Sequence, residues 1–348
     1  MLSSTSTKHR MMTGSPPPPP PPLPRSIYVE PTTRCNQACR QCPRTWLSRE
    51  DDRDLSYDSF RRIVDQFPAL ERVVLHGLGE PLLNDELPRM IRHLKDRGAY
   101  VLFNSNGILL TRERGQALTD ARLDEYRLSM DGATRDTYAK IRGVDAFDTV
   151  LGNVRAFIDR QQAQGAAAPA VSLWFTAMRE NLHELPALID LAGDAGIKEI
   201  YLQRLVYFEE GLARSGQSLF GRSTPEELAS VGRFELACRE RGIAVKAAGT
   251  ATPVESLQRD AGERPWSGCG RPYGSTYITS GGNVLSCCFA PFGHKSASEY
   301  REERVLGNIF EEPIAEIWRG TRYQAFRRAF ESDRPARHCS ECGLSWSY

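Results

Sequence analysis

Eight of the nine cysteines in this 348-residue chain fall into two groups near its two ends. The first group is the triplet Cys35, Cys39 and Cys42, with the spacing Cys-x3-Cys-x2-Cys. Three thiolates are one short of the four ligands that a structural zinc site takes, but they suit a [4Fe-4S] cluster whose fourth iron stays open for another ligand. The triplet indicates an open metal site. By itself it leaves two alternatives, a zinc site completed by a distant histidine and a chance grouping.

The second group of cysteines lies in the C-terminal part of the chain. Four of its members have the spacing of a complete metal cage, namely Cys269, Cys287, Cys339 and Cys342. Four thiolates can enclose a metal fully, so a structural zinc site and an iron–sulfur cluster both fit. Cys288 is left over, either as a packed side chain or as a thiol near the substrate. The isolated Cys238 is expected to be a buried small side chain.

Short aliphatic runs alternate with amphipathic segments from Ser26 onward and predict six strand–helix units. The predicted strands are Ile27–Glu30, Arg72–His76, Tyr100–Asn104, Tyr126–Ser129, Val171–Ala177 and Glu199–Leu205. The predicted helices are Tyr57–Phe67, Leu87–Arg97, Arg112–Ala121, Phe147–Gln164 and Leu182–Ala195. Because each crossover returns the chain in the same direction, the strands should form a parallel sheet that curls into a barrel. The expected fold class is α/β, a partial (β/α)6 barrel with its chemistry at the C-terminal ends of the strands.

We expect three parts along the chain. Residues 1–25 are polar and then run through the prolines Pro16 to Pro22, which favour a disordered polyproline II tail. Residues 26–248 should form the barrel. Residues 249–348 are richer in Gly, Pro and Cys and should form a small α+β domain with a hairpin at Tyr277–Leu285. A metal centre would stabilise so small a core.

Charge and hydropathy argue against two classes of partner. The 45 Lys and Arg residues balance 44 Asp and Glu residues, so a net charge of +1 gives no overall field toward nucleic acid or an acidic membrane. No apolar run reaches the roughly 20 residues that span a bilayer, and no secretory signal is evident. The expected location is the cytoplasm, and the expected partner is a small molecule or a peptide.

The strand ends carry motifs that, together with the cysteine triplet, resemble the radical S-adenosylmethionine (SAM) superfamily. The segment His76-Gly-Leu-Gly-Glu-Pro-Leu82 follows the second predicted strand and is similar to the family's Gly-Gly-Glu-Pro segment. The resemblance implies that the triplet holds a [4Fe-4S] cluster and that Gly77, Gly79 and Glu80 hold the amino group of SAM. Glycines would let the backbone approach the ligand, and the carboxylate would accept a hydrogen bond from an ammonium group.

Two further strand ends extend the resemblance. Asn106 lies in Asn104-Ser-Asn-Gly107, which is similar to the family's Thr-Asn-Gly. Ser129 and Asp131 lie in a Ser-x-Asp-Gly segment after the fourth strand, and the resemblance implies that they face the ribose hydroxyls of SAM. Taken alone, both segments are ordinary turn formers at strand ends.

One position departs from the family pattern. The residue before the third cysteine is often aromatic or large and apolar in the family, where it packs on adenine, but it is Gln41 here. Adenine would then have to pack on Trp46 or Trp174 instead.

The distal cysteines resemble the shortened auxiliary-cluster domain, called SPASM or twitch, that follows some radical SAM barrels. The segments Val305–Ile309 and Ile314–Trp318 share in the resemblance. Longer members carry seven cysteines for two auxiliary clusters, and this chain does not have them. The resemblance therefore implies one auxiliary [4Fe-4S] cluster, held by Cys269, Cys287, Cys339 and Cys342.

Membership of this family implies a defined chemistry. The reduced cluster would pass an electron into SAM, and the resulting 5′-deoxyadenosyl radical would abstract hydrogen from an unactivated carbon. The auxiliary cluster could accept the electron that remains, and a flavodoxin or ferredoxin would supply reducing electrons. Cys288 is a candidate hydrogen donor to a substrate radical, and Arg214 in the loop after the sixth strand is a candidate substrate contact.

Several functions fit these parts. A barrel with one auxiliary cluster resembles 2-deoxy-scyllo-inosamine dehydrogenase and the neomycin-type epimerase, which act on aminocyclitol or sugar carbinols in antibiotic biosynthesis. Dehydrogenation or epimerisation of a polar small molecule is therefore the favoured hypothesis. A maturase for a ribosomally made peptide shares the same parts and is the alternative. The non-enzymatic rival is an interaction protein in which zinc staples both cysteine groups.

Overall fold

A parallel sheet forms the body of the molecule. The structure, a computed structural model, describes residues 21–47, 51–248, 252–258, 264, 266–291 and 303–340. The parallel strands are β1 (Ser26–Val29), β2 (Arg72–Leu75), β3 (Tyr100–Ser105), β4 (Glu125–Ser129), β5 (Ala170–Ala177), β6 (Glu199–Arg204) and β7 (Ala244–Ala247). The six predicted strands are confirmed, with each end displaced by at most one residue. Sequence patterning missed β7, a short strand whose Ala-Val-Lys-Ala sequence carries little signal.

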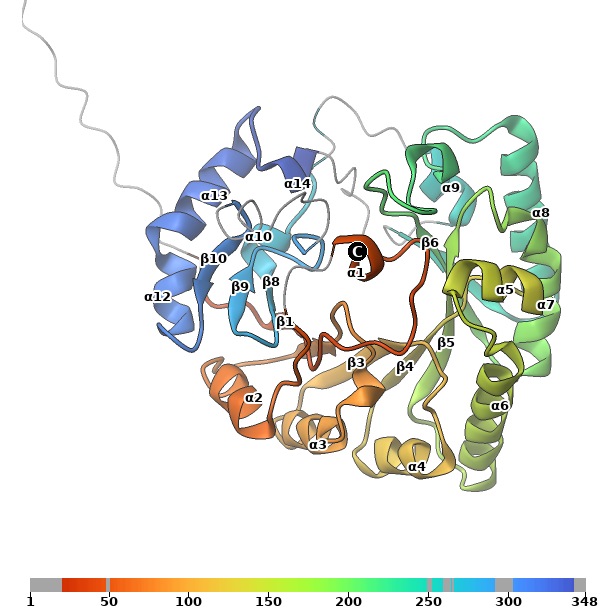
Figure 1. Cartoon of the computed structure of the whole chain (residues 1–348), viewed down its shortest axis with the longest axis horizontal. Helices are drawn as coiled ribbons and strands as arrows, with labels where there is room; N and C mark the ends of the chain where they lie inside the picture. The colour runs from red at the N-terminus through yellow and green to blue at the C-terminus, as the bar shows by residue number, and fades with distance from the viewer. Residues whose placement is uncertain are drawn as a thin grey trace, which may run out of the picture.

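Helices cover the outer face of this curved sheet, as Figure 1 shows. They are α2 (Tyr57–Val64), α3 (Leu87–Asp96), α4 (Arg112–Asp120), α5 (Arg135–Arg142), α6 (Phe147–Ala163), α7 (Leu185–Asp194), α8 (Pro225–Glu240) and α9 (Pro253–Gln258). Single 3-10 turns lie at Pro81–Leu83, Leu182–Glu184 and Ser215–Gln217. Helix α5, which the sequence analysis missed, begins where the Thr134 side chain accepts a hydrogen bond from the Thr137 backbone N–H.

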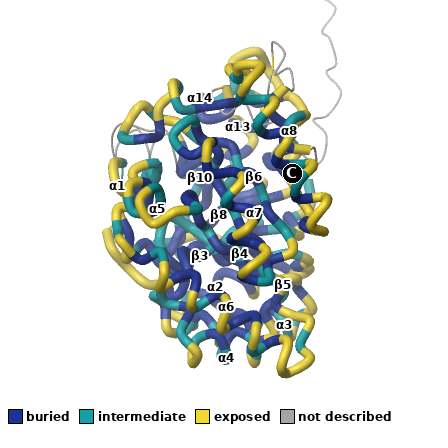
Figure 2. Tube along the Cα trace, turned by 90° about the vertical axis from the view of Figure 1, so that its right-hand side faces the viewer, coloured by how far each residue is buried: buried dark blue, intermediate teal, exposed yellow. Residues whose placement is uncertain are grey.

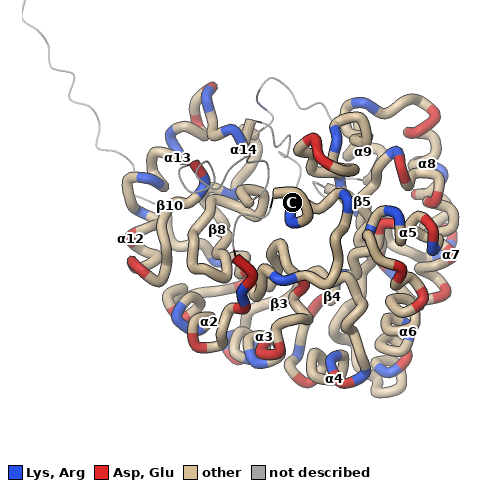
Figure 3. The backbone as a smooth tube through the Cα atoms, viewed as in Figure 1, with Lys and Arg blue, Asp and Glu red and all other residues tan. Residues whose placement is uncertain are grey.

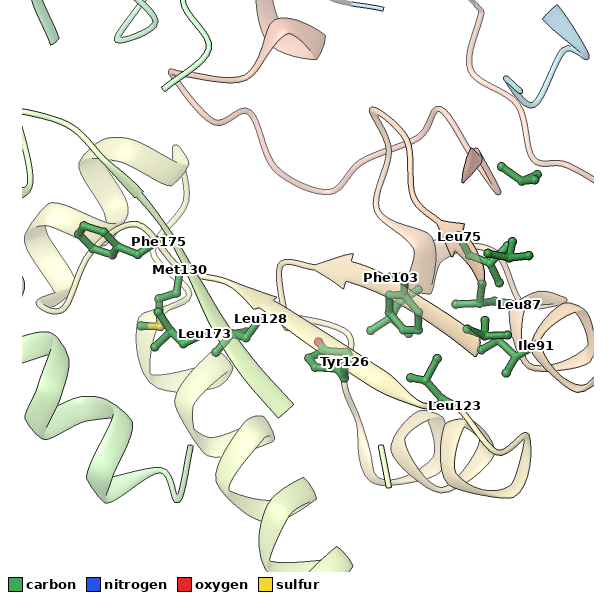
Figure 4. Packing of buried hydrophobic residues seen from close by; sticks show 14 of the residues in the cluster. Leu75, Leu87, Ile91, Phe103, Leu123, Tyr126, Leu128, Met130, Leu173 and Phe175 are labelled. Carbon is green, nitrogen blue, oxygen red and sulfur yellow. The ribbon is translucent and has the colours of Figure 1, made fainter. Parts of the chain in front are cut away.

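The two faces of the sheet differ in chemistry because successive strand residues point to opposite sides. Outward residues such as Val73, Phe103 and Leu128 are fully buried against the helices. Figure 4 shows Phe103 of β3 beside Leu87 and other residues of α3. Figure 2 shows the buried strands enclosed by more exposed helices. The core therefore lies between the sheet and its helices, which leaves the inner face of the sheet for polar side chains.

The C-terminal part extends the same sheet. Strand β8 (Ser275–Ile278) pairs with β1 in parallel and with β9 (Asn283–Leu285) in antiparallel orientation. Strand β9 also pairs antiparallel with β10 (Val305–Asn308). The described strands form one sheet in the order β10-β9-β8-β1-β2-β3-β4-β5-β6-β7. The predicted hairpin is confirmed. Short helices flank this part, namely α10 (Arg271–Gly274), α12 (Ile314–Arg319), α13 (Thr321–Glu331) and α14 (Arg337–Ser340).

A buried carboxylate joins the two parts of the sheet. Glu30, which follows β1, is 2% exposed. Its Oε1 accepts hydrogen bonds from the Leu78 backbone N–H at 2.9 Å and from the Tyr277 hydroxyl at 3.1 Å. Its Oε2 accepts from the backbone N–H and hydroxyl of Ser280, at 3.2 and 3.4 Å. Glu30 thus connects the end of β1 to the loop after β2 and to the β8–β9 turn.

We expect Glu30→Gln to lower the free energy of unfolding by about 2 kcal/mol, because an amide NH2 group would face donors that now bind a carboxylate oxygen. Urea denaturation under anaerobic conditions measures this. Glu240→Gln, at the exposed end of α8, is the matched control and should change stability by less than about 0.5 kcal/mol. Equal stability of the two variants would show that Glu30 does not join the two parts of the sheet.

Candidate active site

The first cysteine triplet lies in the loop after β1, just before the short helix α1 (Pro43–Leu47). The loop is closed by its own backbone, since the Cys42 N–H donates to the Cys39 carbonyl at 3.1 Å. Burial raises the pKa of Cys35 to about 11 and that of Cys42 to about 12, and neighbouring cysteines of the triplet add to both shifts. The structure therefore brings the three thiols close enough to influence one another, with Cys39 buried and Cys35 and Cys42 half-buried. In Figure 1, α1 lies over the centre of the barrel.

The donor set of the triplet fits an iron–sulfur cluster. Among the described residues, no three His, Cys, Asp or Glu side chains are arranged to hold a single metal ion. Three neighbouring thiols, without a fourth ligand among the described residues, match a cluster that keeps one iron open. Because the raised pKa values keep these thiols protonated at neutral pH, binding iron would release their protons.

The predicted glycine motif packs tightly against the cysteine loop. A Cβ on Gly79 would lie 2.2 Å from the Thr32 carbonyl oxygen, and the Glu80 N–H donates to the Arg34 carbonyl at 2.8 Å. A Cβ on Gly77 would lie 2.2 Å from Cγ of Glu30. These glycines let the loop after β2 approach the loop after β1, a physical role that differs from the expected approach to a ligand.

Glu80 links the ends of two strands. Its carboxylate is 3% exposed and accepts hydrogen bonds from the Asn106 N–H and the Ser105 hydroxyl, both at 2.7 Å, and from the Leu82 N–H at 3.1 Å. Burial raises its pKa. Because an ionised carboxylate accepts about four hydrogen bonds, these three leave room for one more donor. The predicted contact between Glu80 and the SAM amino group stays a prediction.

Asn106 and Ser129 lie at neighbouring strand ends, as expected. The Asn106 side chain donates to the Asn36 side-chain oxygen at 2.7 Å and so ties the end of β3 to the cysteine loop. Ser129 is half-buried at the end of β4, opposite Trp174 of β5 in the sheet register. Their contacts with SAM stay predictions.

A buried ion pair, absent from the sequence predictions, connects Asp131 to the triplet. Asp131 is 1% exposed and pairs with Arg142, the last residue of α5, at 2.9 Å. The guanidinium of Arg142 also donates to Cys39 Sγ at 3.8 Å. The Gln41 side chain donates to Oδ2 of Asp131, while Oδ1 accepts from the Thr176 N–H at 2.7 Å. Protein donors thus engage both oxygens of Asp131, and its predicted contact with ribose stays a prediction.

The two tryptophans proposed for adenine lie in different surroundings. Trp46 is 42% exposed, and its indole N–H donates to the Arg40 carbonyl at 3.1 Å. Trp174 is stacked on Tyr201, with ring centroids 3.9 Å apart, and the Arg127 guanidinium lies over the indole at 4.2 Å. With Tyr201 and Arg127 packed on Trp174, its role as an adenine platform stays a prediction.

A large cavity occupies the inside of the partial barrel. Its volume is about 850 Å³, within the range of small-molecule sites. The inner-face residues of successive strands line it, among them Arg72, His76, Arg127, Trp174 and Tyr201. Burial lowers the pKa of His76 to about 4, so this side chain is neutral at pH 7.

Arg214 is not among the residues that line this cavity. Its side chain is exposed and donates to the Gly211 carbonyl of its own loop at 3.1 Å. The predicted contact of Arg214 with substrate stays a prediction, and this geometry gives it no support.

Three cysteines of the second group converge in the C-terminal part. Cys269, Cys287 and Cys339 line one small pocket beside His338. Burial raises the pKa of Cys339, and Cys287 and Cys269 raise it further. The fourth predicted ligand, Cys342, lies outside the described residues. Three thiols that line one pocket, with Cys339 buried and the other two half-buried, fit an iron–sulfur cluster in the same way as the first triplet does.

Cys288 points away from this pocket and into the barrel. It lines the large cavity together with Arg271 and Tyr28. The Arg271 guanidinium donates to Cys288 Sγ at 2.7 Å, and Tyr28 packs in the same cluster as the thiol. Arg271 lines the auxiliary pocket as well, so it stands between the two sites. The sequence analysis identified Cys288 as a candidate site residue but missed Arg271. The one sequence feature that could have indicated Arg271 is its position two residues after Cys269.

Family models match both parts of the chain. The model described as "Radical SAM superfamily" matches residues 29–192, and the model described as "Iron-sulfur cluster-binding domain" (SPASM) matches residues 269–343. The described residues contain no helix that is long and apolar enough to cross a membrane.

Individual relatives span most of the chain. A PqqA peptide cyclase of Streptomyces rochei is 28% identical over 324 residues, which cover 91% of this chain and 82% of that protein. An Fe-coproporphyrin III synthase of Methanosarcina barkeri is 25% identical over 309 residues, covering 82% and 71%. The fold is similar to that of Streptococcus suis SuiB bound to the precursor peptide SuiA, with a TM-score of 0.64 at 15% identity, over 88% of this chain and 67% of that one.

Iron analysis tests the two cysteine groups separately. Anaerobically reconstituted protein should hold about eight irons, four in each [4Fe-4S] cluster. Replacing Cys35, Cys39 and Cys42 together by Ala should remove about four, and replacing Cys269, Cys287 and Cys339 should remove the other four. Cys238→Ala, a buried cysteine outside both groups, is the control. Stoichiometric zinc without iron, or loss of all the iron in either variant, would contradict the assignment.

Proposed function

The chain belongs to the radical SAM superfamily and carries a C-terminal SPASM domain, and on that premise we propose that it oxidises a polar small molecule held in the barrel cavity. The two domains imply a SAM-binding [4Fe-4S] cluster, SAM and an auxiliary iron–sulfur centre. When bound, these groups supply a 5′-deoxyadenosyl radical that removes hydrogen from the substrate, and an acceptor for one electron. We assign the first cluster to Cys35, Cys39 and Cys42 and the auxiliary cluster to Cys269, Cys287, Cys339 and Cys342.

One observation carries the proposal, namely that the large cavity and the auxiliary pocket share a wall. Arg271, Phe289 and His338 line both spaces. A substrate in the cavity would then lie on the other side of these three side chains from the auxiliary site. This arrangement suits a reaction in which a carbinol loses one hydrogen atom, one electron and one proton and becomes a carbonyl group.

The protein's own residues would position the reactants. The cysteine loop and the Gly77–Glu80 loop are held together by backbone contacts, so SAM would meet a site whose shape is fixed before it binds. The cavity walls enclose a substrate, which would keep water from a reactive radical. Serine, tyrosine and asparagine side chains on the walls, such as Ser172, Tyr28 and Asn104, offer hydrogen bonds to a polar substrate.

Epimerisation is a second candidate because Cys288 faces the same cavity. A thiol can return a hydrogen atom to a carbon radical, and then no electron leaves the substrate. The sulfur radical left on Cys288 would be reduced to the thiol by one electron from the auxiliary centre and one proton from solvent. The hydrogen bond from Arg271 holds the sulfur against the cavity wall. A peptide substrate is the other alternative, and the peptide cyclase among the relatives supports it.

Formation of 5′-deoxyadenosine tests the proposed class of reaction. The reconstituted protein, given dithionite and SAM, should produce 5′-deoxyadenosine that liquid chromatography with mass spectrometry detects. Cys35→Ala should reduce the rate to background, whereas Cys238→Ala should retain it. If 5′-deoxyadenosine still forms in the Cys35→Ala protein, the triplet is not the catalytic centre.

Solvent deuterium distinguishes the two outcomes for the substrate. Candidate carbinols and peptides are first screened for a mass change. In deuterium oxide, an epimerised product should carry about one deuterium at the reacting carbon, and Cys288→Ala should lower that incorporation at least tenfold because the donor is lost. Cys238→Ala should behave as the unaltered protein does. Unchanged incorporation in Cys288→Ala would remove Cys288 as the donor, and a product two hydrogens lighter would identify the reaction as oxidation.

A further inference from the structure

The ion pair of Arg142 and Asp131 is set apart from the other described ion pairs by its burial. Its side chains are 8% and 2% exposed, and every other pair of the described residues has a partner that is more than a tenth exposed. Figure 3 shows acidic and basic residues interspersed along the outer helices. Because removing two charges from water costs free energy even when they pair, a pair this deep points to a role beyond stability.

Helix α5 holds Arg142 against the cysteine loop through contacts of the backbone. The Ile141 carbonyl accepts a hydrogen bond from the Arg40 N–H at 2.8 Å. Gly143, which follows the helix, lies so close to the loop that a Cβ on it would be 2.6 Å from the Ala38 carbonyl oxygen. The end of α5 is therefore fixed against the loop, and Arg142 is its last residue.

The guanidinium of Arg142 uses different nitrogens for its two partners. Nη1 donates to Cys39 Sγ at 3.8 Å, and Nη2 lies 2.9 Å from Oδ2 of Asp131. Asp131 is itself held by the Thr176 N–H at 2.7 Å and by the Gln41 side chain. Because Cys39 is one of the three cysteines assigned to the first cluster, a fixed positive charge and a hydrogen-bond donor lie against one sulfur of that site.

Such a contact affects how easily a cluster accepts an electron. Reduction adds one negative charge to a group that three thiolates already hold, so a hydrogen bond to a sulfur and a nearby positive charge both stabilise the reduced form. The effect is larger where water is excluded, as it is around this pair. The carboxylate of Asp131 acts in the opposite sense, but the guanidinium is the member of the pair that contacts Cys39.

We propose that Arg142 is a positioning residue that raises the reduction potential of the first cluster through Cys39. In the step that it assists, one electron passes from a low-potential donor, such as a reduced flavodoxin, to the oxidised cluster. No bond forms or breaks in this step. The inference rests on the proposed function, because it takes Cys35, Cys39 and Cys42 as the ligands of that cluster.

A redox titration followed by electron paramagnetic resonance (EPR) tests the proposal on the reconstituted protein with both clusters. S-adenosylhomocysteine, which lacks the cleavable sulfonium of SAM, is added to parallel samples, and the EPR signal that it changes identifies the cluster with the open iron. The potential of that signal should fall by at least about 59 mV in Arg142→Gln, which is a tenfold drop in the ratio of reduced to oxidised cluster at a fixed potential. Arg142→Lys keeps the charge and should restore most of the potential.

Asp131→Asn separates an effect of charge from a loss of structure. Without the carboxylate the charge of the guanidinium is unopposed, so the potential should rise in this variant, opposite to its change in Arg142→Gln. Lys140→Gln is the matched control, because Lys140 lies on the same helix, is exposed and pairs with Glu180. It should leave the potential unchanged. Iron content and circular dichroism verify that each variant keeps its clusters and its fold.

Two results would overturn the proposal. One is an unchanged potential in Arg142→Gln, and the other is a shift of the same sign in Arg142→Gln and Asp131→Asn, which would make the pair purely structural. If Arg142→Gln does not retain the cluster, a fall or no change of the potential in Asp131→Asn overturns the proposal as well.

Formation of 5′-deoxyadenosine by the unaltered protein is measured on the same preparations. If it occurs while the potential does not respond to the variants, the role of Arg142 is wrong and the proposed function stands. If no EPR signal responds to S-adenosylhomocysteine and no 5′-deoxyadenosine forms, both are wrong.

Discussion

The arrangement of the two cysteine sites depends on a single buried charge, the carboxylate of Glu30. A carboxylate removed from water is stable only where donors surround it. Glu30 finds its donors in the loop after β2, in strand β8 and in the β8–β9 turn, and the first is far in sequence from the other two. Satisfying this charge holds the SPASM part against the barrel. It also fixes the end of β1, from which the first cysteine loop begins.

The pairing of β8 with β1 has a consequence for the inside of the barrel. A closed eight-stranded barrel fills its interior with apolar side chains. Here β7 and β10 are the terminal strands of the sheet formed by the described residues, and they do not pair with each other. The apolar core lies outside, between strands and helices, and it includes Phe103 and Tyr126. The inner face is thus free to carry charged residues, and the SPASM part supplies Arg271 and Cys288 to one side of the same cavity.

Much of the fold could be predicted from the sequence because strand periodicity and motif spacing are local features of the chain. Strand periodicity located the six predicted strands, and cysteine spacing identified thiols that the structure places near one another in each group, although the clusters they would hold stay predictions. The features that the sequence did not predict are contacts between segments that are distant along the chain. Nothing near Ser275 indicates that β8 pairs parallel with β1, because register depends on partners far along the chain. The same holds for the pair formed by Asp131 and Arg142, since a buried arginine and a solvated one look alike in sequence.

The departure from the family pattern at Gln41 has a physical explanation in this network. An apolar residue there would leave an oxygen of Asp131 with one donor fewer, in a site that is almost fully buried. Asp131 in turn holds Arg142, whose guanidinium reaches Cys39. The glutamine amide therefore completes a chain of polar contacts from the end of β4 to the cysteine loop. Gln41 thus departs from the family motif in sequence but supplies a hydrogen-bond donor that an aromatic ring lacks. This donor helps to satisfy the buried ion pair beside the cluster site.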